Sequence, residues 1–233
     1  EALLNAVAQW GKERGMENIQ GPMGITDFDK EGMLLEDFDR MGSINTIYNY
    51  AYYPKHMEAL GYKKEVDWVQ IHIDIPPETP KKYARVARYS KEMFNLKVKK
   101  MTNKDITRRG YGYKIFHLLN EAYRPIFGFT ELTDKQIDDF VNQYLNLVDK
   151  QLIITMCSLS KAMRKTQGKL FPFGWFHLLK ALKWKKEDNA EMLLIAVRPD
   201  YQMLGVNAIF FDDLTPIYNK HGIQWAETGP QLE

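Results

Sequence analysis

The run from Leu193 to Ala208 constrains this chain more than any other segment, because it predicts a strand, a tight turn and a helix start in succession. Five consecutive apolar residues, Leu193 to Val197, are typical of a central strand covered on both faces. Pro199 ends the strand, since proline has no N–H for the sheet. Gly205 allows a tight turn, and an apolar helical pattern begins at Val206. This order of elements favours the α/β fold class.

The turn between this strand and helix is a candidate anion-binding site. The first turn of a helix leaves backbone N–H groups without partners, and the positive end of the helix dipole lies at the same point. A phosphate group bound near Val206 would meet both. The spacing alone is equally compatible with a strand–Gly–helix connection that binds no ligand.

The turn resembles that of the GNAT-type acetyltransferases, in which Arg or Gln is followed after two residues by Gly, one further residue, and Gly or Ala. Gln202, Gly205 and Asn207 occupy these positions here, and Asn207 departs from the family pattern. The resemblance implies acetyl-coenzyme A as co-substrate, with its pyrophosphate bound by the turn. The residues implied in that binding are Val197, Gln202, Met203, Leu204, Gly205, Val206, Asn207 and Ala208.

A similar helix–strand unit occurs twice and suggests an internal repeat. Residues 208–214 and 221–230 give a helix pattern, a short strand pattern and a Gly-Pro pair. Residues 2–7 and 14–22 give the same order. We therefore predict two GNAT-like units in one chain, with mixed sheets flanked by helices. The alternative is that any two helix–strand units share this order.

The resemblance extends through the first copy. Asn49, the pair Gly61-Tyr62 and a strand pattern from Val66 to Ile71 follow in the family's order. Many family members carry a Tyr four residues before that Gly, as general acid for the departing thiolate, and this chain has Met57 there. The first copy is therefore expected to be catalytically silent.

Prolines mark the boundary between the two units. The segment from Pro76 to Pro80 ends the preceding strand pattern and begins a helix. Residues 1–76 are predicted to form the C-terminal half of a first GNAT-like domain, and residues 77–233 a second one that is incomplete at its C-terminal end. On the same resemblance, we expect residues to be absent before 1, near 152–156 and after 233.

Two basic segments in the second unit leave alternatives open. The predicted helix after Pro80 carries basic side chains that suit a solvated face, an acidic partner or the 3′-phosphate of the coenzyme. Residues 158–184 have no counterpart in a minimal GNAT domain and are therefore a candidate source of specificity. Their aromatic run from Leu170 to Trp175 suits an acyl-chain tunnel or a cover over the sheet edge.

The resemblance also implies a mechanism in which an amine attacks the thioester directly and a general base accepts its proton. A carboxylate near the reacting strands can serve as this base. Glu227, on the predicted strand after the phosphate-binding helix, is the candidate. The alternative is a surface carboxylate or one in a salt bridge.

Composition and charge limit the classes of partner that the sequence predicts. The net charge of +2 over 233 residues gives no nucleic-acid-binding field, and no apolar run reaches the roughly 20 residues of a membrane span. Neither nucleic acid nor membrane is therefore expected as a partner. The five histidines lack metal-ligand spacing, so no metal site is expected. A single cysteine, Cys157, excludes an internal disulfide and favours a cytoplasmic location.

Taken together, these features predict an acetyl-CoA-dependent N-acyltransferase acting on a small-molecule or peptide amine, similar to bacterial tandem-GNAT proteins of unassigned substrate. One alternative is a FemAB-like aminoacyl or peptidyl transferase, which also pairs two such folds. Another is a catalytically silent binding module, which Asn207 and Met57 would favour. The sequence specifies neither the acceptor, nor the acyl chain length, nor the oligomeric state.

Overall fold

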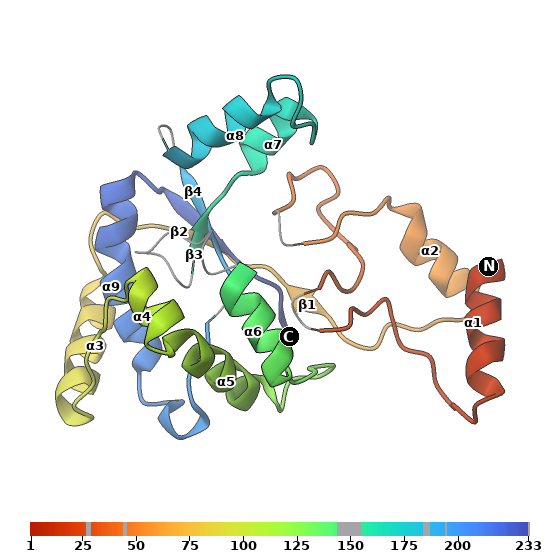
Figure 1. Ribbon diagram of the computed structural model, residues 1–233, viewed down its shortest axis with the longest axis horizontal. Coiled ribbons are helices and arrows are strands. Elements are labelled where there is room, and N and C mark those ends of the chain that lie inside the picture. The colour runs from red at the N-terminus through yellow and green to blue at the C-terminus, as the bar shows by residue number, and fades with distance from the viewer. Residues whose placement is uncertain (27–28, 44–45, 144–154, 184–186, 194, 233) are drawn as a thin grey trace.

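The computed structural model describes residues 1–26, 29–43, 46–143, 155–183, 187–193 and 195–232. It has a mixed α/β architecture, as the sequence predicted (Figure 1). Residues 68–232, called the body below, contain all the strands of the described residues and most of the helices. Residues 1–67, called the N-terminal region, extend to one side of the body (Figure 1). The gap expected near 152–156 falls mostly outside the described residues.

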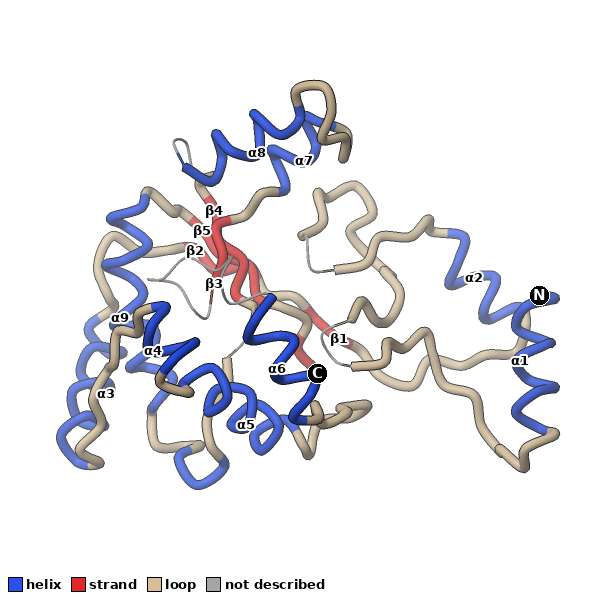
Figure 2. Tube along the Cα trace, in the orientation of Figure 1, coloured by secondary structure: helices blue, strands red, loops and turns tan. Residues whose placement is uncertain are grey.

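The main sheet, which is red in Figure 2, has four strands in the order β2-β5-β4-β3. Among these described strands only β4 and β5 run parallel. A second sheet pairs β1 with β6 in antiparallel orientation. The strands are β1 (Trp68–Val69), β2 (His72–Asp74), β3 (Thr155–Cys157), β4 (Asn189–Met192), β5 (Trp225–Thr228) and β6 (Gln231–Leu232). The last strands assigned to the first unit, β1 and β2, therefore pair with the last strands of the chain.

Helix α9 (Val206–His221) connects the two parallel strands, because parallel neighbours require a crossover. Its apolar side packs on one face of the sheet, where Ala190 and Ala226 are inaccessible to solvent. Helix α3 (Lys81–Met93) packs against α9 on the side away from the sheet (Figure 1). Ala87 of α3 packs against Ala208 and Ile209 of α9, and these residues form a small apolar core between the two helices.

A second apolar core forms among α4 (Asn103–Arg108), α5 (Tyr111–Tyr123) and α6 (Asp134–Gln143). Phe116 and Leu119 of α5 meet Ile137 and Val141 of α6 there. Helices α7 (Ser160–Thr166) and α8 (Gly174–Lys183) form a separate hairpin at one end of the body (Figure 1).

The N-terminal region contains α1 (Ala2–Lys12) and α2 (Tyr52–Ala59), joined by turns and loops. The strand predicted within residues 14–22 is wrong: the structure has no strand there, and a single backbone hydrogen bond, from Gly32 N–H to the Pro22 carbonyl at 2.9 Å, does not form a ladder. None of the helices in the described residues combines the length and apolar character needed to cross a membrane.

Candidate functional site

The central strand lies earlier in the chain than predicted. β4 covers Asn189–Met192, all four residues buried, whereas the described residues of the predicted strand Leu193 to Val197 lie outside the sheet. The prediction of a strand buried on both faces is correct in kind and wrong in position. Apolar periodicity missed β4 because Asn189 and Glu191 are polar, and buried polar side chains depend on partners elsewhere in the chain.

The chain leaves the sheet directly after β4. Gly229 N–H still donates to the Met192 carbonyl at 2.8 Å, which is the last pairing between the two parallel strands. Beyond it, the Tyr123 hydroxyl of α5 donates to the Ile195 carbonyl at 2.9 Å. Ala196 packs against the core formed by α5 and α6. The described residues of the apolar run are thus half-buried against helices, and β4 and β5 separate at their carboxyl ends.

The predicted anion-binding turn lies between this segment and α9. The short 3₁₀ helix η1 (Pro199–Tyr201) follows Arg198, which forms an ion pair with Asp200. Gln202 donates from Nε2 to the Val197 carbonyl at 3.1 Å, and the Met203 side chain is fully exposed. No side chain caps the N-terminus of α9, so the first N–H groups of the helix are available to a ligand.

Gly205 allows the tight turn that the sequence predicted, and it also lets α3 lie close to that turn. It is the N-cap of α9 with a φ of 75°, in the left-handed region that favours glycine. A Cβ there would lie 2.7 Å from both Ser90 Oγ and Val86 Cγ1 of α3. The Ser90 hydroxyl donates to the Leu204 carbonyl at 2.7 Å. Gly205 therefore allows α3 to pack against the turn.

The remaining predicted turn residues divide into two groups. Asn207 is exposed and Val206 is half-buried, so both can border a ligand. The Ala208 side chain is buried between α9 and α3, and its N–H donates to the Gly205 carbonyl at 3.0 Å, so Ala208 offers no free donor to a ligand. Arg85 and Arg88 of α3 are exposed, but they do not share the helix face through which Val86 and Ser90 meet Gly205.

Glu227 lies on β5, as predicted, and the register brings it beside a second carboxylate. Glu227 pairs with Glu191 of β4 on one side and with His72 of β2 on the other. Paired residues of neighbouring strands project from the same face, about 5 Å apart at Cα. This face is opposite the one that carries Ala190 and Ala226 and packs on α9. The sheet therefore has one apolar and one polar face.

Glu191 is a candidate that the sequence reasoning missed. Its side chain is only 3% exposed, and it accepts hydrogen bonds from Ser158 Oγ at 2.9 Å and Ser160 Oγ at 3.3 Å. Alternation of polar and apolar residues from Asn189 to Met192 was the signal that could have identified the strand and this residue.

The N-terminal region approaches the polar face of the sheet. The carboxylate of Asp37, 3.1 Å from Arg40 Nη1, raises the pKa of Arg40, and Glu227 adds a smaller effect in the same direction. His72 stacks on Trp225 with ring centroids 4.8 Å apart. Glu227 is thus near a basic side chain and aromatic rings. Within the described ranges, no cluster of three or more His, Cys, Asp or Glu could hold a metal ion.

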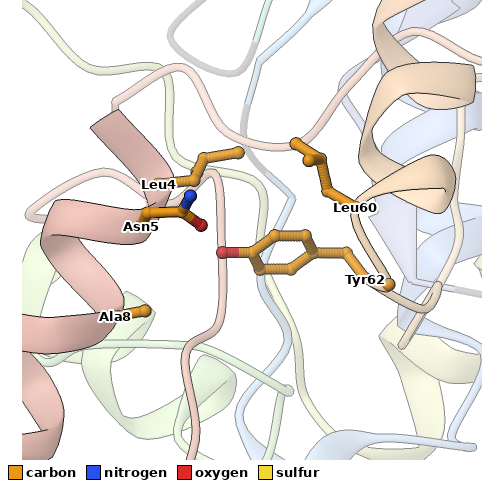
Figure 3. A pocket seen from close by; sticks show the side chains of 6 residues that line it. Leu4, Asn5, Ala8, Leu60 and Tyr62 are labelled. Atoms are coloured by element: carbon orange, nitrogen blue, oxygen red, sulfur yellow. The ribbon is translucent and has the colours of Figure 1, made fainter. Parts of the chain in front are cut away.

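Two surface depressions lie away from the predicted turn. One, of about 210 Å³, lies between α1 and the segment after α2, where Tyr62 faces Leu4 and Asn5 (Figure 3). It contains no charged side chain and belongs wholly to the N-terminal region. The other, of about 400 Å³, is lined by Met41 and by basic residues of α7. Neither is lined by a residue of the predicted turn.

Comparison with known proteins gives two relatives, and no protein-family model matches the chain. Protein YghO of Escherichia coli (strain K12) is 25% identical over 229 residues, which cover 89% of this chain and 56% of that protein. Bacterial ceramide synthase of Caulobacter vibrioides (strain NA1000 / CB15N) is 24% identical over 214 residues, which cover 86% and 55%. The chain thus spans about half the length of the curated relatives it matches. Both are bacterial proteins, in agreement with the expected source.

Proposed function

We propose that this chain takes part in acyl transfer from an acyl-coenzyme A thioester to an amine. The observation that carries the proposal is the β4–α9–β5 unit. It brings the uncapped start of α9 to the carboxyl ends of two parallel strands, each of which carries a glutamate one residue from its end. Ligands of open α/β sheets bind at this edge. The name of one relative, a ceramide synthase, describes the formation of an amide from an amine.

The turn before α9 is suited to the phosphates of the coenzyme. Backbone N–H groups near Val206 and the helix dipole both favour an anion. The exposed Arg85 and Arg88 of α3 are candidates for attracting a second phosphate, while Arg198 is already paired with Asp200. We assign pyrophosphate binding to Val197 and to the turn from Gln202 to Ala208, with the N–H groups of Val206 and Asn207 as the proposed donors.

Glu227 is the proposed general base. It is half-buried and therefore reachable, whereas Glu191 is enclosed and bonded to two serine hydroxyls. The amine nitrogen forms a bond to the thioester carbon, the carbon–sulfur bond breaks, and Glu227 accepts the proton that the amine loses. That proton can then neutralise the departing thiolate. Glu191 is proposed to position the strand pair rather than to touch the reacting atoms.

The arrangement of the strands also bears on the two-unit proposal. We infer that residues 1–76 are the C-terminal half of a first GNAT-like unit and residues 77–233 a second unit that is incomplete at its C-terminal end. Because β1 and β2 pair with β6 and β5, the two proposed units share both sheets of the described residues.

The test of the base compares Glu227→Gln with Asp74→Asn. Asp74 lies on the same face of the sheet, at the neighbouring strand, and its side chain is 92% exposed. Transfer of a radiolabelled acyl group to a panel of amines should fall by about 100-fold or more in Glu227→Gln and stay near the unsubstituted rate in Asp74→Asn. Coenzyme affinity, measured by calorimetry, should be unchanged in both. Full activity in Glu227→Gln would remove the assignment.

The test of the turn avoids Gly205, because its substitution disrupts packing against α3. Asn207→Asp puts a negative charge at the start of α9, where the dipole stabilises it, so folding is preserved. The same charge repels a diphosphate, and coenzyme affinity should fall roughly tenfold, while Asn207→Ala should change it little. Equal affinity in both variants would contradict binding at this turn. Binding of aminoacyl-tRNA in place of the coenzyme would favour the FemAB-like alternative.

A further inference from the structure

The hairpin of α7 and α8 displays large apolar side chains to solvent. Phe171 is 80% exposed and Phe173 is 72% exposed, in contrast to Phe116 in the core at 5%. Leu170, Trp175 and Phe176 extend the same exposed surface. The aromatic run therefore neither encloses a tunnel nor covers the sheet edge in this structure. An exposed group of this kind marks an interaction surface.

Hydrogen bonds within the loop hold these side chains in place. Trp175 N–H donates to the Leu170 carbonyl at 2.9 Å, and its indole Nε1 donates to the Pro172 carbonyl at 3.1 Å. Phe176 N–H donates to the Phe173 carbonyl at 3.1 Å. The apolar residues are thus presented by a defined turn at the start of α8.

The same hairpin also carries exposed basic side chains. Arg164, Lys165, Lys169 and Lys180 are exposed, and no carboxylate pairs with them among the described residues. Lys161 is paired with Asp188. The basic residues of α7 also line the depression of about 400 Å³ beside Met41. The hairpin therefore combines about four uncompensated positive charges with five exposed apolar side chains.

We propose that this hairpin, residues 160–183, docks on a membrane surface that contains anionic phospholipids. Aromatic side chains partition into the interfacial layer of a bilayer, and basic side chains are attracted to acidic headgroups. Stable attachment to a membrane surface generally needs both signals. A second copy of this chain fits the surface less well, since a symmetric contact would bring like charges together. No membrane partner was expected from the sequence, because no apolar run is long enough to span a bilayer, and that criterion does not detect surface attachment. This proposal does not rest on the proposed acyl transfer.

The experiment is flotation of the purified protein with two kinds of vesicle, phosphatidylcholine alone and phosphatidylcholine mixed with phosphatidylglycerol. We expect binding to the mixed vesicles that weakens as salt is added. The double variant Phe171→Ser with Phe173→Ser should bind about 100-fold more weakly, since each phenylalanine contributes roughly tenfold. Lys165→Ala with Lys169→Ala should reduce binding to anionic vesicles by about fivefold per charge.

Matched controls distinguish binding through the hairpin from non-specific binding of the protein to vesicles. Tyr89 of α3 is 58% exposed and lies outside the hairpin, so Tyr89→Ser should bind vesicles as the unsubstituted protein does. Circular dichroism checks that each variant is folded. Absence of vesicle binding at low salt, or equal binding by the double phenylalanine variant, would overturn the proposal. Loss of a dimer in that variant, seen by light scattering without vesicle binding, would overturn it in favour of a second copy.

Discussion

The body and the N-terminal region both contain amphipathic helices, but the apolar side chains of these helices are buried much more fully in the body. In the body, Ile137 and Tyr218 are almost inaccessible within helices packed on other elements. In the N-terminal region, α1 buries only Gly11, α2 buries none of its residues, and Leu3 is 81% exposed. Apolar periodicity therefore predicts where a helix forms, whereas burial depends on the surface that lies opposite.

The largest expected difference between the regions comes from removing apolar side chains. Ile137→Ala should lower the free energy of unfolding by about 2–5 kcal/mol, because it leaves a cavity at a fully buried position. Leu3→Ala should change it by less than about 0.5 kcal/mol. Urea denaturation followed by circular dichroism measures both. Similar losses would mean that α1 is packed in solution and that the contrast is wrong.

A pair of glycines tests the packing of α3 on α9 within the body. Gly205 and Gly222 have almost the same φ, 75° and 73°, but a Cβ meets α3 only at Gly205. Gly222→Ala should cost about 1 kcal/mol from backbone strain alone. Gly205→Ala should cost about 2–4 kcal/mol, because steric overlap with Val86 and Ser90 is added. Equal melting shifts for the two variants would argue against close packing here.

Two asparagines make the same contact in the two regions. Asn120 bonds both the N–H and the carbonyl of Leu132, and Asn49 does the same for Leu34. Only Asn120 is buried. Asn120→Ala should destabilise the protein by about 1–3 kcal/mol, and Asn49→Ala by less than about 1 kcal/mol. Denaturation midpoints of the two variants compare them directly, and the reverse order would contradict the difference in burial.

The smallest expected effect concerns pH and the start of α4. Asp105 accepts from Thr102 Oγ1 at 2.6 Å, Thr102 N–H at 2.9 Å and Arg109 Nη1 at 2.8 Å. The bonds from Thr102, and then that from Arg109, hold the pKa of Asp105 well below its usual range. A lowered folded-state pKa gives stability that is present above the unfolded pKa of about 3.9 and is lost as the pH falls below it.

Asp105→Asn should therefore differ from the unsubstituted protein most at neutral pH. The difference between their unfolding midpoints should be constant from about pH 5 to 8 and shrink below about pH 4, where the unfolded carboxyl becomes protonated. Urea denaturation across this range measures it. A difference that is independent of pH would show that the carboxylate charge does not contribute.

The sequence predicted elements that local patterns determine. The start of α9 at Val206 and the position of Glu227 on the following strand follow from short-range periodicity, and the structure agrees. The α/β class is likewise confirmed. The assignment of turn residues to coenzyme binding, the domain boundary at 76 and the acceptor stay predictions.

Elements that depend on distant partners were missed. β4 carries Glu191, whose partner Ser158 is 33 residues away, so its polar residues concealed a buried strand. The apolar run after β4 contacts α5 instead, where Tyr123 donates a hydrogen bond to the Ile195 carbonyl across 72 residues, and its described residues are half-buried. Gly205 was correctly singled out, but its neighbour Ser90 on α3 is distant in sequence. Patterns within a short stretch of sequence do not predict contacts between residues this far apart.

The pairing of β2 with β5 has a consequence for the order of folding during synthesis. Ile71 N–H donates to Thr228 Oγ1 across 157 residues, and the edge strands β1 and β2 find their neighbours only in the last segment of this sequence. Until that segment leaves the ribosome, the backbone groups of β2 have no sheet to join. Contacts between such distant residues slow folding, because a long loop must close first. Completion of this sheet is therefore expected to be a late step in the folding of residues 68–232.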